Sequence, residues 1–336
     1  MQLDLSLMGT PLEAVGERAA MLQGLGADGC FTAEGPADVF FPLVAAGIAS
    51  DLALMTNAAI AFPRNPIHLA HAAFDLQRLS GGKFRLGLAP QVRSHIERRF
   101  GLTWSQPVER MREVVEAVRA ITTTWSTGAP LSYAGKFYRH ELMTPMFTPP
   151  LMDLPPPPIL LGAQGSKMAE MAGEVADGLL VLPFHSQRLL ESVTFPALER
   201  GRQRAEGRCF ETVCGAIVGV GTDEASLEAA NLGVRGLLGF YGSTPAYAEV
   251  LRAEGLGALH DELRLAVRAG DWGSLISLVP DELVAAVATV GTPDDVASRL
   301  CSRFGGIADR LSLFIPHQVD DLTLGSLVAA VRRLDD

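Results

Sequence analysis

A turn with the sequence Gly-Ala-Gln-Gly-Ser joins a short apolar run to a segment with helical spacing. Small residues at such a junction let backbone N–H groups and the start of the helix approach an anion. Gly162, Ala163, Gln164, Gly165 and Ser166 are therefore a candidate site for a cofactor phosphate. An ordinary turn between a strand and a helix uses the same residue types, and the sequence alone leaves this alternative open.

Four more polar side chains follow short apolar runs. Glu34 is suited to orient a bound ring or to handle a proton, although a solvated carboxylate or one that caps the next helix is an equal alternative. His95 has an imidazole suited to proton delivery near pH 7, and Gln91 is suited to bind ring carbonyl groups. The alternative for His95 is a solvated surface within the basic segment 93–99, which also suits an anionic cofactor tail. His185 is a weaker candidate for cofactor binding, because a loop histidine needs no special role.

Two histidines have the spacing of neighbours on a helix, but they do not make a metal site. His68 and His71 are three residues apart, no glutamate adjoins them, and no third ligand is evident. We expect no metal, and we expect these side chains to pack or to face solvent.

The elements that position these residues repeat along the chain. Short runs rich in Val, Leu, Ile and Ala alternate with longer segments of helical spacing, which is typical of βα units. The predicted strands are 3–9, 27–34, 52–60, 80–89, 158–162, 176–183, 211–221 and 309–316. The predicted helices are 11–26, 38–50, 66–79, 108–125, one from 166, one ending near 204, 223–238 with Thr222 as its cap, one from 292, and one at the end of the chain.

Eight strands with intervening helices favour a closed (β/α)8 TIM barrel, in the α/β class, over a doubly wound sheet. The doubly wound alternative lacks a GxGxxG motif after an early strand. Residues 1–336 are predicted to be one domain, with a rim hairpin and a Pro-rich connector at about 127–158 and an insertion at about 240–290. The chemistry of such a barrel lies where its strands end.

The amino-acid composition limits the classes of molecule that this protein is expected to bind. The net charge of −10 and the absence of a basic stripe argue against nucleic acid, and the hydrophobic share of 48% indicates a folded chain. The sequence has neither a signal-peptide pattern nor an apolar run of membrane length, so we expect a cytoplasmic location, no membrane contact and a small-molecule substrate. The four cysteines lack CxxC spacing and suit reduced thiols.

Several blocks resemble the luciferase-like monooxygenase family. Residues 55–89, with an Arg-x-Pro helix start and a Ser-Gly-Gly-Lys turn, resemble its third and fourth units, 157–181 its fifth and sixth, and 290–300 its late Gly-Thr-Pro helix start. Residues 91–121 and 240–247 resemble an actinobacterial branch of F420-dependent oxidoreductases. Two departures stand out: Gly35 replaces a histidine of many F420-dependent relatives, and Ala89-Pro90 replaces a common Gly-Thr.

The resemblance implies a bacterial luciferase-like barrel that binds coenzyme F420, with FMN as the alternative. It implies a non-prolyl cis peptide at Asn57–Ala58 that supports the middle ring of the cofactor, and a phosphate site at Gly162–Ser166. It also implies a homodimer, which the apolar segments 38–50 and 66–79 would form.

The function implied is hydride transfer between C5 of the deazaflavin and a small organic substrate, as a reductase of an activated C=C, C=N or C=O bond. An FMN-dependent monooxygenase of the same fold is the alternative. A non-catalytic protein that binds flavin or deazaflavin is a further one.

Overall fold

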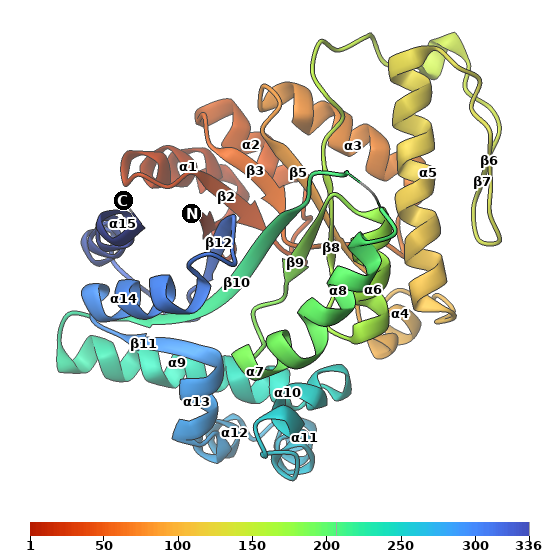
Figure 1. Cartoon of the computed structure of the whole chain (residues 1–336). Helices are drawn as coiled ribbons and strands as arrows, with labels where there is room; N and C mark the ends of the chain where they lie inside the picture. Colours follow the sequence, from red (N-terminus) through yellow and green to blue (C-terminus); the bar gives the residue numbers. More distant parts are fainter. Residues whose placement is uncertain (206, 336) are drawn as a thin grey trace.

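Eight parallel strands close into a barrel in the computed structural model, which describes residues 1–205 and 207–335 (Figure 1). β12 pairs with both β10 and β1 and so closes the ring. The predicted TIM barrel is confirmed. In barrel order the strands are β1 (Gln2–Ser6), β2 (Gly29–Thr32), β3 (Ala53–Thr56), β5 (Phe84–Ala89), β8 (Ile159–Gly162), β9 (Gly178–Val181), β10 (Glu211–Val220) and β12 (Arg310–Phe314).

Helices cover the outside of the barrel and follow the strands as predicted. α3 has the predicted bounds, because Asn65 accepts a hydrogen bond from the Ile67 amide and Pro66 occupies the first turn. The predicted cap Thr222 is wrong: Asp223 caps α9, accepting from the Ser226 amide at 2.8 Å. The helices are η1 (Leu12–Ala14), α1 (Val15–Gly24), α2 (Phe41–Ala49), α3 (Pro66–Leu79), α5 (Pro107–Thr127), α6 (Ser166–Val175), α7 (Gln187–Leu189), η3 (Leu190–Thr194), α8 (Phe195–Arg202), α9 (Glu224–Gly242), α14 (Pro293–Phe304) and α15 (Asp321–Asp335).

Some elements differ from the prediction. The predicted strand 52–60 is two strands, β3 and β4 (Ala59–Ile60), which are separated at Asn57–Ala58. A short helix, α4 (Arg93–Arg98), and a strand that pairs with β10, β11 (Ala288–Gly291), were not predicted. On the rim, β6 (Tyr133–Ala134) and β7 (Arg139–His140) form an antiparallel hairpin beside α5, and η2 (Pro145–Phe147) interrupts the Pro-rich connector.

Residues 240–290 are largely helical and have a hydrophobic cluster of their own. Leu251, Leu263 and Leu275 from this segment pack with Phe184 and Ile217 from the barrel. The helices of this segment lie close together, below β11 and α9 in the view of Figure 1. They are η4 (Pro245–Tyr247), α10 (Ala248–Ala253), α11 (Leu259–Ala269), α12 (Trp272–Leu278) and α13 (Asp281–Val287).

A buried ion pair lies inside the barrel, where β1 meets β12. Arg310 Nε donates to Asp4 Oδ2 at 2.8 Å, Arg310 Nη2 pairs with Asp4 Oδ1, and both side chains are 2% exposed. Gly29 on β2 makes room for the pair, because a Cβ there would lie 2.7 Å from Arg310 Nη2 and 2.9 Å from the Ala53 oxygen. The two charges therefore compensate each other away from water.

Helix α2 has an apolar face at the surface of the molecule. Phe41, Val44 and Ile48 expose 65%, 40% and 74% of their surface along one face of α2, where the sequence places the dimer contact. The homodimer stays a prediction. Within the described ranges, no helix is both long and apolar enough to cross a membrane.

Asp4→Ala tests the buried ion pair. Removing the carboxylate leaves the Arg310 charge buried without compensation, so we expect a loss of about 3–5 kcal/mol, measured by urea unfolding. Replacing both residues, as Asp4→Leu with Arg310→Met, should restore most of that loss. Asp294→Ala is the control, since it breaks an ion pair with Arg333 whose side chains are 81% and 63% exposed, and should cost less than about 1 kcal/mol. Equal midpoints for Asp4→Ala and the control would contradict the assignment.

Candidate functional site

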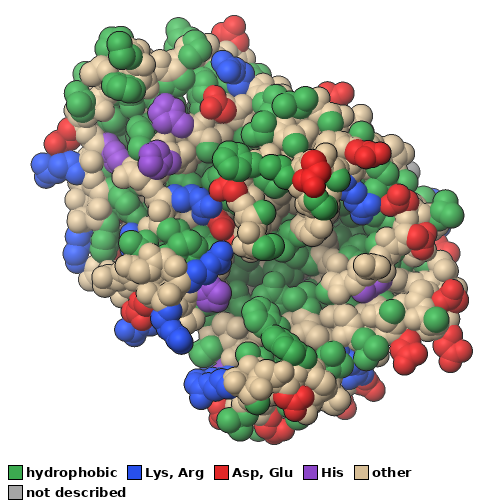
Figure 2. All heavy atoms as spheres, turned by 180° about the vertical axis from the view of Figure 1, so that it is seen from behind, with side chains coloured by type: hydrophobic (Ala, Val, Ile, Leu, Met, Phe, Trp, Pro, Cys, Tyr) green, Lys and Arg blue, Asp and Glu red, His purple; other side chains and the backbone are tan. Residues whose placement is uncertain are grey.

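A cavity of about 950 Å³ opens at the carboxyl ends of the barrel strands. Its wall is built by the segments that follow β1, β2, β3, β5, β8, β9 and β12, and by the end of α9 with η4. Figure 2 shows a central hollow in one face of the molecule, with hydrophobic side chains gathered inside it. This is the end at which βα barrels carry their chemistry.

Most of the sequence-predicted site residues come together on this wall, and three do not. The wall includes Glu34, Asn57, Ala58, Gln91, His95, Gly162, Gln164 and Gly165. Ala163 is 3% exposed and packs in the core, Ser166 is exposed at the first position of α6, and His185 is buried. These three lie off the wall as the described residues define it.

The peptide bond between Asn57 and Ala58 is cis, as predicted. The Asn57 amide donates to the Thr32 oxygen at 2.6 Å, which ties the end of β3 to the end of β2. Asn57 is 4% exposed, and its Oδ1 has no hydrogen-bond partner among the residues described. A buried acceptor without a partner is costly in a folded protein, so this oxygen on the cavity wall is suited to a ligand N–H.

The turn before α6 offers both amides and a second buried acceptor. Gly165 is the N-terminal cap of α6. The first backbone hydrogen bond of the helix runs from the Ala169 amide to the Gly165 oxygen, at 3.0 Å. The preceding helical amides are free of acceptors within the helix and suit an anion. Gln164 Nε2 donates to the Phe184 oxygen at 2.8 Å, while Gln164 Oε1 is buried without a partner in the described structure.

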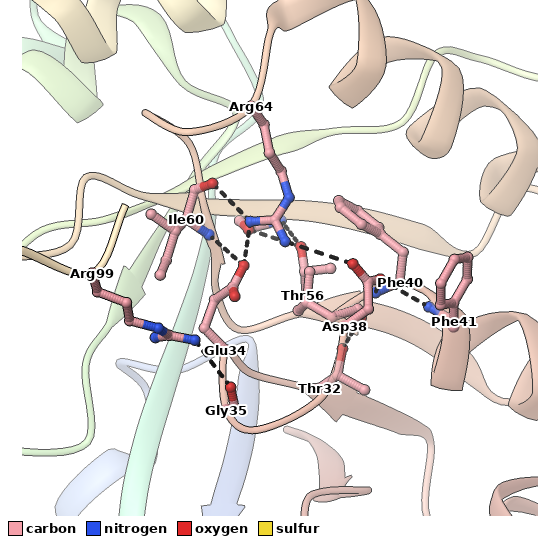
Figure 3. Close-up of polar contacts among 12 residues, drawn as sticks. Thr32, Glu34, Gly35, Asp38, Phe40, Phe41, Thr56, Ile60, Arg64 and Arg99 are labelled. Carbon is pink, nitrogen blue, oxygen red and sulfur yellow. Dashed lines mark hydrogen bonds and ion pairs between the residues drawn. The ribbon is translucent and has the colours of Figure 1, made fainter. Parts of the chain in front are cut away.

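Glu34 is held by an ion pair rather than solvated (Figure 3). Its Oε1 accepts from the Ile60 amide at 3.0 Å and pairs with Arg64 Nη1, which also donates to the Ile60 oxygen at 2.9 Å. The Glu34 side chain is only 9% exposed. Asp38, not Glu34, accepts from the amides at the start of α2, at Phe40 and Phe41. The carboxylate therefore ties the end of β2 to β4 and to the loop that precedes α3.

Gln91 and His95, four residues apart, both lie on the wall but differ in their hydrogen bonding. Gln91 has a left-handed backbone with φ of 66°, and its Oε1 accepts from the Val92 amide at 2.9 Å. His95 lies on α4 and is exposed, with no side-chain hydrogen bond to any described residue. Its imidazole is therefore free to meet a substrate or water at the mouth of the cavity.

His185 lies behind the wall. Its Nδ1 is 2.8 Å from the Leu182 oxygen, its backbone oxygen accepts from Arg303 at 3.0 Å, and its ring packs against Phe304. Burial, together with the Arg303 guanidinium, lowers the pKa of His185 to about 3, so the ring is neutral. The structure thus gives His185 a packing position, while its neighbour Phe184 lines the cavity.

An aromatic group on the opposite side of the cavity was not predicted from the sequence. Phe184, Phe240, Tyr241 and Tyr247 line it, and their rings lie within 6.0 Å of one another as a chain of contacts. The segment 240–247 was noted only for its resemblance to relatives. Arg64, the partner of Glu34, was also missed, because 30 residues separate the two.

The chain is similar in sequence to several known proteins. The luciferase-like monooxygenase family model matches residues 2–310. An uncharacterised protein of Mycobacterium tuberculosis is 45% identical over 303 residues, covering 89% of each chain. The 5,10-methylenetetrahydromethanopterin reductase of Archaeoglobus fulgidus is 31% identical over 247 residues, covering 70% of each.

The fold itself recurs in a solved structure. The coenzyme F420-dependent tetrahydromethanopterin reductase of Methanopyrus kandleri has a TM-score of 0.83 at 18% identity, and the match covers 100% of this chain and 99% of that one. The family model spans most of the described barrel, from β1 into β12. The chain therefore belongs to the luciferase-like monooxygenase family.

Proposed function

We propose that this protein is an F420-dependent oxidoreductase that transfers a hydride between C5 of the deazaflavin and a small organic substrate, acting as a reductase of an activated C=C, C=N or C=O bond. The observation that carries the proposal is the pair of buried, unpartnered acceptors, Asn57 Oδ1 and Gln164 Oε1, on one cavity wall with the start of α6. A ligand that combines a ring N–H with a phosphate would satisfy this wall.

The residues of the wall fit such a cofactor. Asn57 and Ala58 would support the ring, and Gln164 Oε1 would accept a hydrogen bond from the cofactor. Gly162 and Gly165 with the first amides of α6 would hold the phosphate. F420 and FMN both carry a ring N–H and a phosphate. The choice of F420 is supported by the resemblance of residues 91–121 and 240–247 to F420-dependent oxidoreductases and by the F420 dependence of the Methanopyrus reductase.

When bound, the reduced deazaflavin supplies a hydride, and the protein supplies position and the accompanying proton. His95 is the residue we assign to proton delivery, because its imidazole is exposed at the mouth and has no partner within the described part of the chain. Glu34, engaged by Arg64 and the Ile60 amide, fixes the loop beside Asn57 and Ala58. Gln91 borders the same space and would bind a ring carbonyl through its amide nitrogen.

The cofactor is tested by titration. We expect F420 to bind with quenching of its fluorescence, and we expect FMN to bind at least about tenfold more weakly, both measured on the same cofactor-free protein. Tight FMN without F420 binding would favour the monooxygenase. F420 binding without reduction of any ketone, enone or imine in a substrate panel would favour a non-catalytic role.

The phosphate site is tested at the first position of α6. Ser166→Pro removes one amide donor, and proline is well accepted there because Gly165 is extended, with φ of −82° and ψ of 152°. We expect F420 affinity to fall roughly tenfold or more, the usual effect of losing a hydrogen bond to a charged group. Ser166→Ala keeps the amide and should bind F420 within about threefold of the unchanged protein. Equal affinities for the two variants would place the phosphate elsewhere.

Proton delivery is tested by His95→Gln. We expect kcat for the best substrate of the panel to fall about 100-fold or more, while F420 affinity and the thermal midpoint stay unchanged, since the side chain is exposed and unpartnered. Glu34→Gln should instead lower the thermal midpoint, because it weakens the ion pair with Arg64. A normal kcat in His95→Gln would assign the proton to water or to another group.

A further inference from the structure

Two tyrosine hydroxyls on the cavity wall have no hydrogen-bond partner among the described residues. The chain has four tyrosines. Tyr133 donates to Glu116 at 3.1 Å, and Tyr138 accepts from Arg110 at 3.1 Å, both outside the cavity. Tyr241 and Tyr247 line the cavity, and neither hydroxyl has a hydrogen bond to any described residue. These two hydroxyls are free to bind a ligand.

The two rings are held in place by aromatic packing. Tyr241 and Tyr247 meet edge to face, with centroids 5.5 Å apart. Phe184 lies 5.7 Å from the first ring and 5.9 Å from the second, and it is 1% exposed. Gln164 Nε2 binds the Phe184 oxygen, which links this aromatic group to the turn before α6. The hydroxyls are thus presented by fixed rings rather than by a mobile loop.

Both hydroxyls are proton donors at any physiological pH. Burial raises the pKa of Tyr241, and the neighbouring Tyr247 phenol raises it further. Burial likewise raises the pKa of Tyr247. A neutral phenol donates one hydrogen bond, so the pair suits an acceptor oxygen on the ligand.

The segment that carries the two tyrosines adds no charged side chain to the wall. The segment from α9 to η4 contributes to the wall only Leu237, Phe240, Tyr241, Thr244, Ala246 and Tyr247. The charged wall residues Arg18, Glu34 and Arg99 come from other segments. Arg18 pairs with Asp321 and Glu34 with Arg64, and Arg99 donates to the Gly35 oxygen at 3.2 Å. Beside the aromatic group, a ligand would therefore meet apolar surface and two donors, without a counter-ion for a carboxylate or phosphate.

We propose that Tyr241 and Tyr247 bind the carbonyl oxygen of the substrate, and that this substrate is a neutral, largely apolar ketone or enone. The inference rests on the proposed function and names its substrate class. It adds two catalytic residues that contact the reacting group, on the side of the cavity opposite Asn57.

For an enone, the proposed reaction is a hydride addition to the C=C bond that is followed by protonation. The hydride from the reduced deazaflavin forms a C–H bond at the β-carbon, and the electron pair of the C=C bond shifts to make an enolate. The two phenols donate hydrogen bonds to the enolate oxygen, where the charge develops. A proton, delivered through His95 or water, then adds to the α-carbon, and the oxidised deazaflavin remains.

The test uses tyrosine-to-phenylalanine variants of the full chain. Cyclohex-2-en-1-one is the probe, with 1-methylcyclohexene, which lacks the carbonyl, and cyclohexanecarboxylate, which is anionic, for comparison. Ligand-observed NMR gives the affinities on cofactor-free protein, and turnover with reduced F420 gives kcat and KM. Tyr133→Phe is the matched control, because it removes a hydroxyl that lies outside the cavity.

We expect unchanged protein to bind the enone more tightly than either comparison compound. The double variant Tyr241→Phe with Tyr247→Phe should weaken enone binding about tenfold or more and lower kcat/KM about 100-fold, with F420 affinity and thermal midpoint unchanged. Each single variant should show part of this loss, and Tyr133→Phe should stay within about twofold.

The outcomes separate this inference from the proposed function. Enone affinity that the double variant keeps, or tighter binding of the carboxylate than of the enone, overturns the inference even if F420 binds and turns over. Failure of F420 binding overturns the proposed function, whereas enone binding that depends on the two hydroxyls would still support the tyrosine site.

Discussion

Pairing of β12 with β1 is the constraint on which the rest of the structure depends. It joins the last strand to the first, and only a closed ring brings the carboxyl ends of all its strands around one cavity. The register sets Gln2 opposite Arg310 and Asp4 opposite Ser312. A slip of one residue would turn Asp4 to the other face of the strand and leave the Arg310 guanidinium buried alone, so the ion pair specifies the register.

A close contact between β3 and β5 positions the backbone next to the site. The Thr56 hydroxyl donates to the Gly87 oxygen at 2.8 Å and accepts from the Gly87 amide at 2.9 Å, which joins β3 to β5 one residue before Asn57. A Cβ at Gly87 would collide with the Thr56 oxygen and lie 2.6 Å from Leu180. Beside Thr56 the two strands can approach this closely only because residue 87 is glycine, and this contact fixes the backbone one residue before Asn57.

The sequence predicted the elements whose signals are local. α3 was placed correctly because Asn65, Pro66 and a regular apolar spacing lie within one segment. α4 was missed because it is six residues long with one buried side chain, Ile96, too short for a periodic pattern to register.

The sequence likewise predicted the site residues that directly follow strands, but not the contacts between distant segments. The turn before α6 and Asn57 follow strands directly, so the topology alone brings them to the cavity. The position of His185 after a strand does not determine which way its ring points, and the ring points into the core. The pairing of Glu34 with Arg64 and the meeting of Tyr241 with Phe184 depend on contacts between distant segments, which no local pattern reports.

The two sides of the cavity pack against different hydrophobic clusters. For this reason one side could be predicted from the sequence and the other could not. The side with Asn57 and Gly162 belongs to the barrel, where a large cluster packs strand residues against α1, α3 and α5 and a smaller one includes Phe31 and Met55. The side with Tyr241 and Tyr247 packs against a separate cluster formed by Phe184, Leu251 and Leu275 with their neighbours. The two clusters meet at the barrel, because the second also includes Ile217 of β10 and Ala288 of β11. On the proposed function, the cofactor would be held by residues of the barrel, and the substrate would meet residues at the start of the insertion.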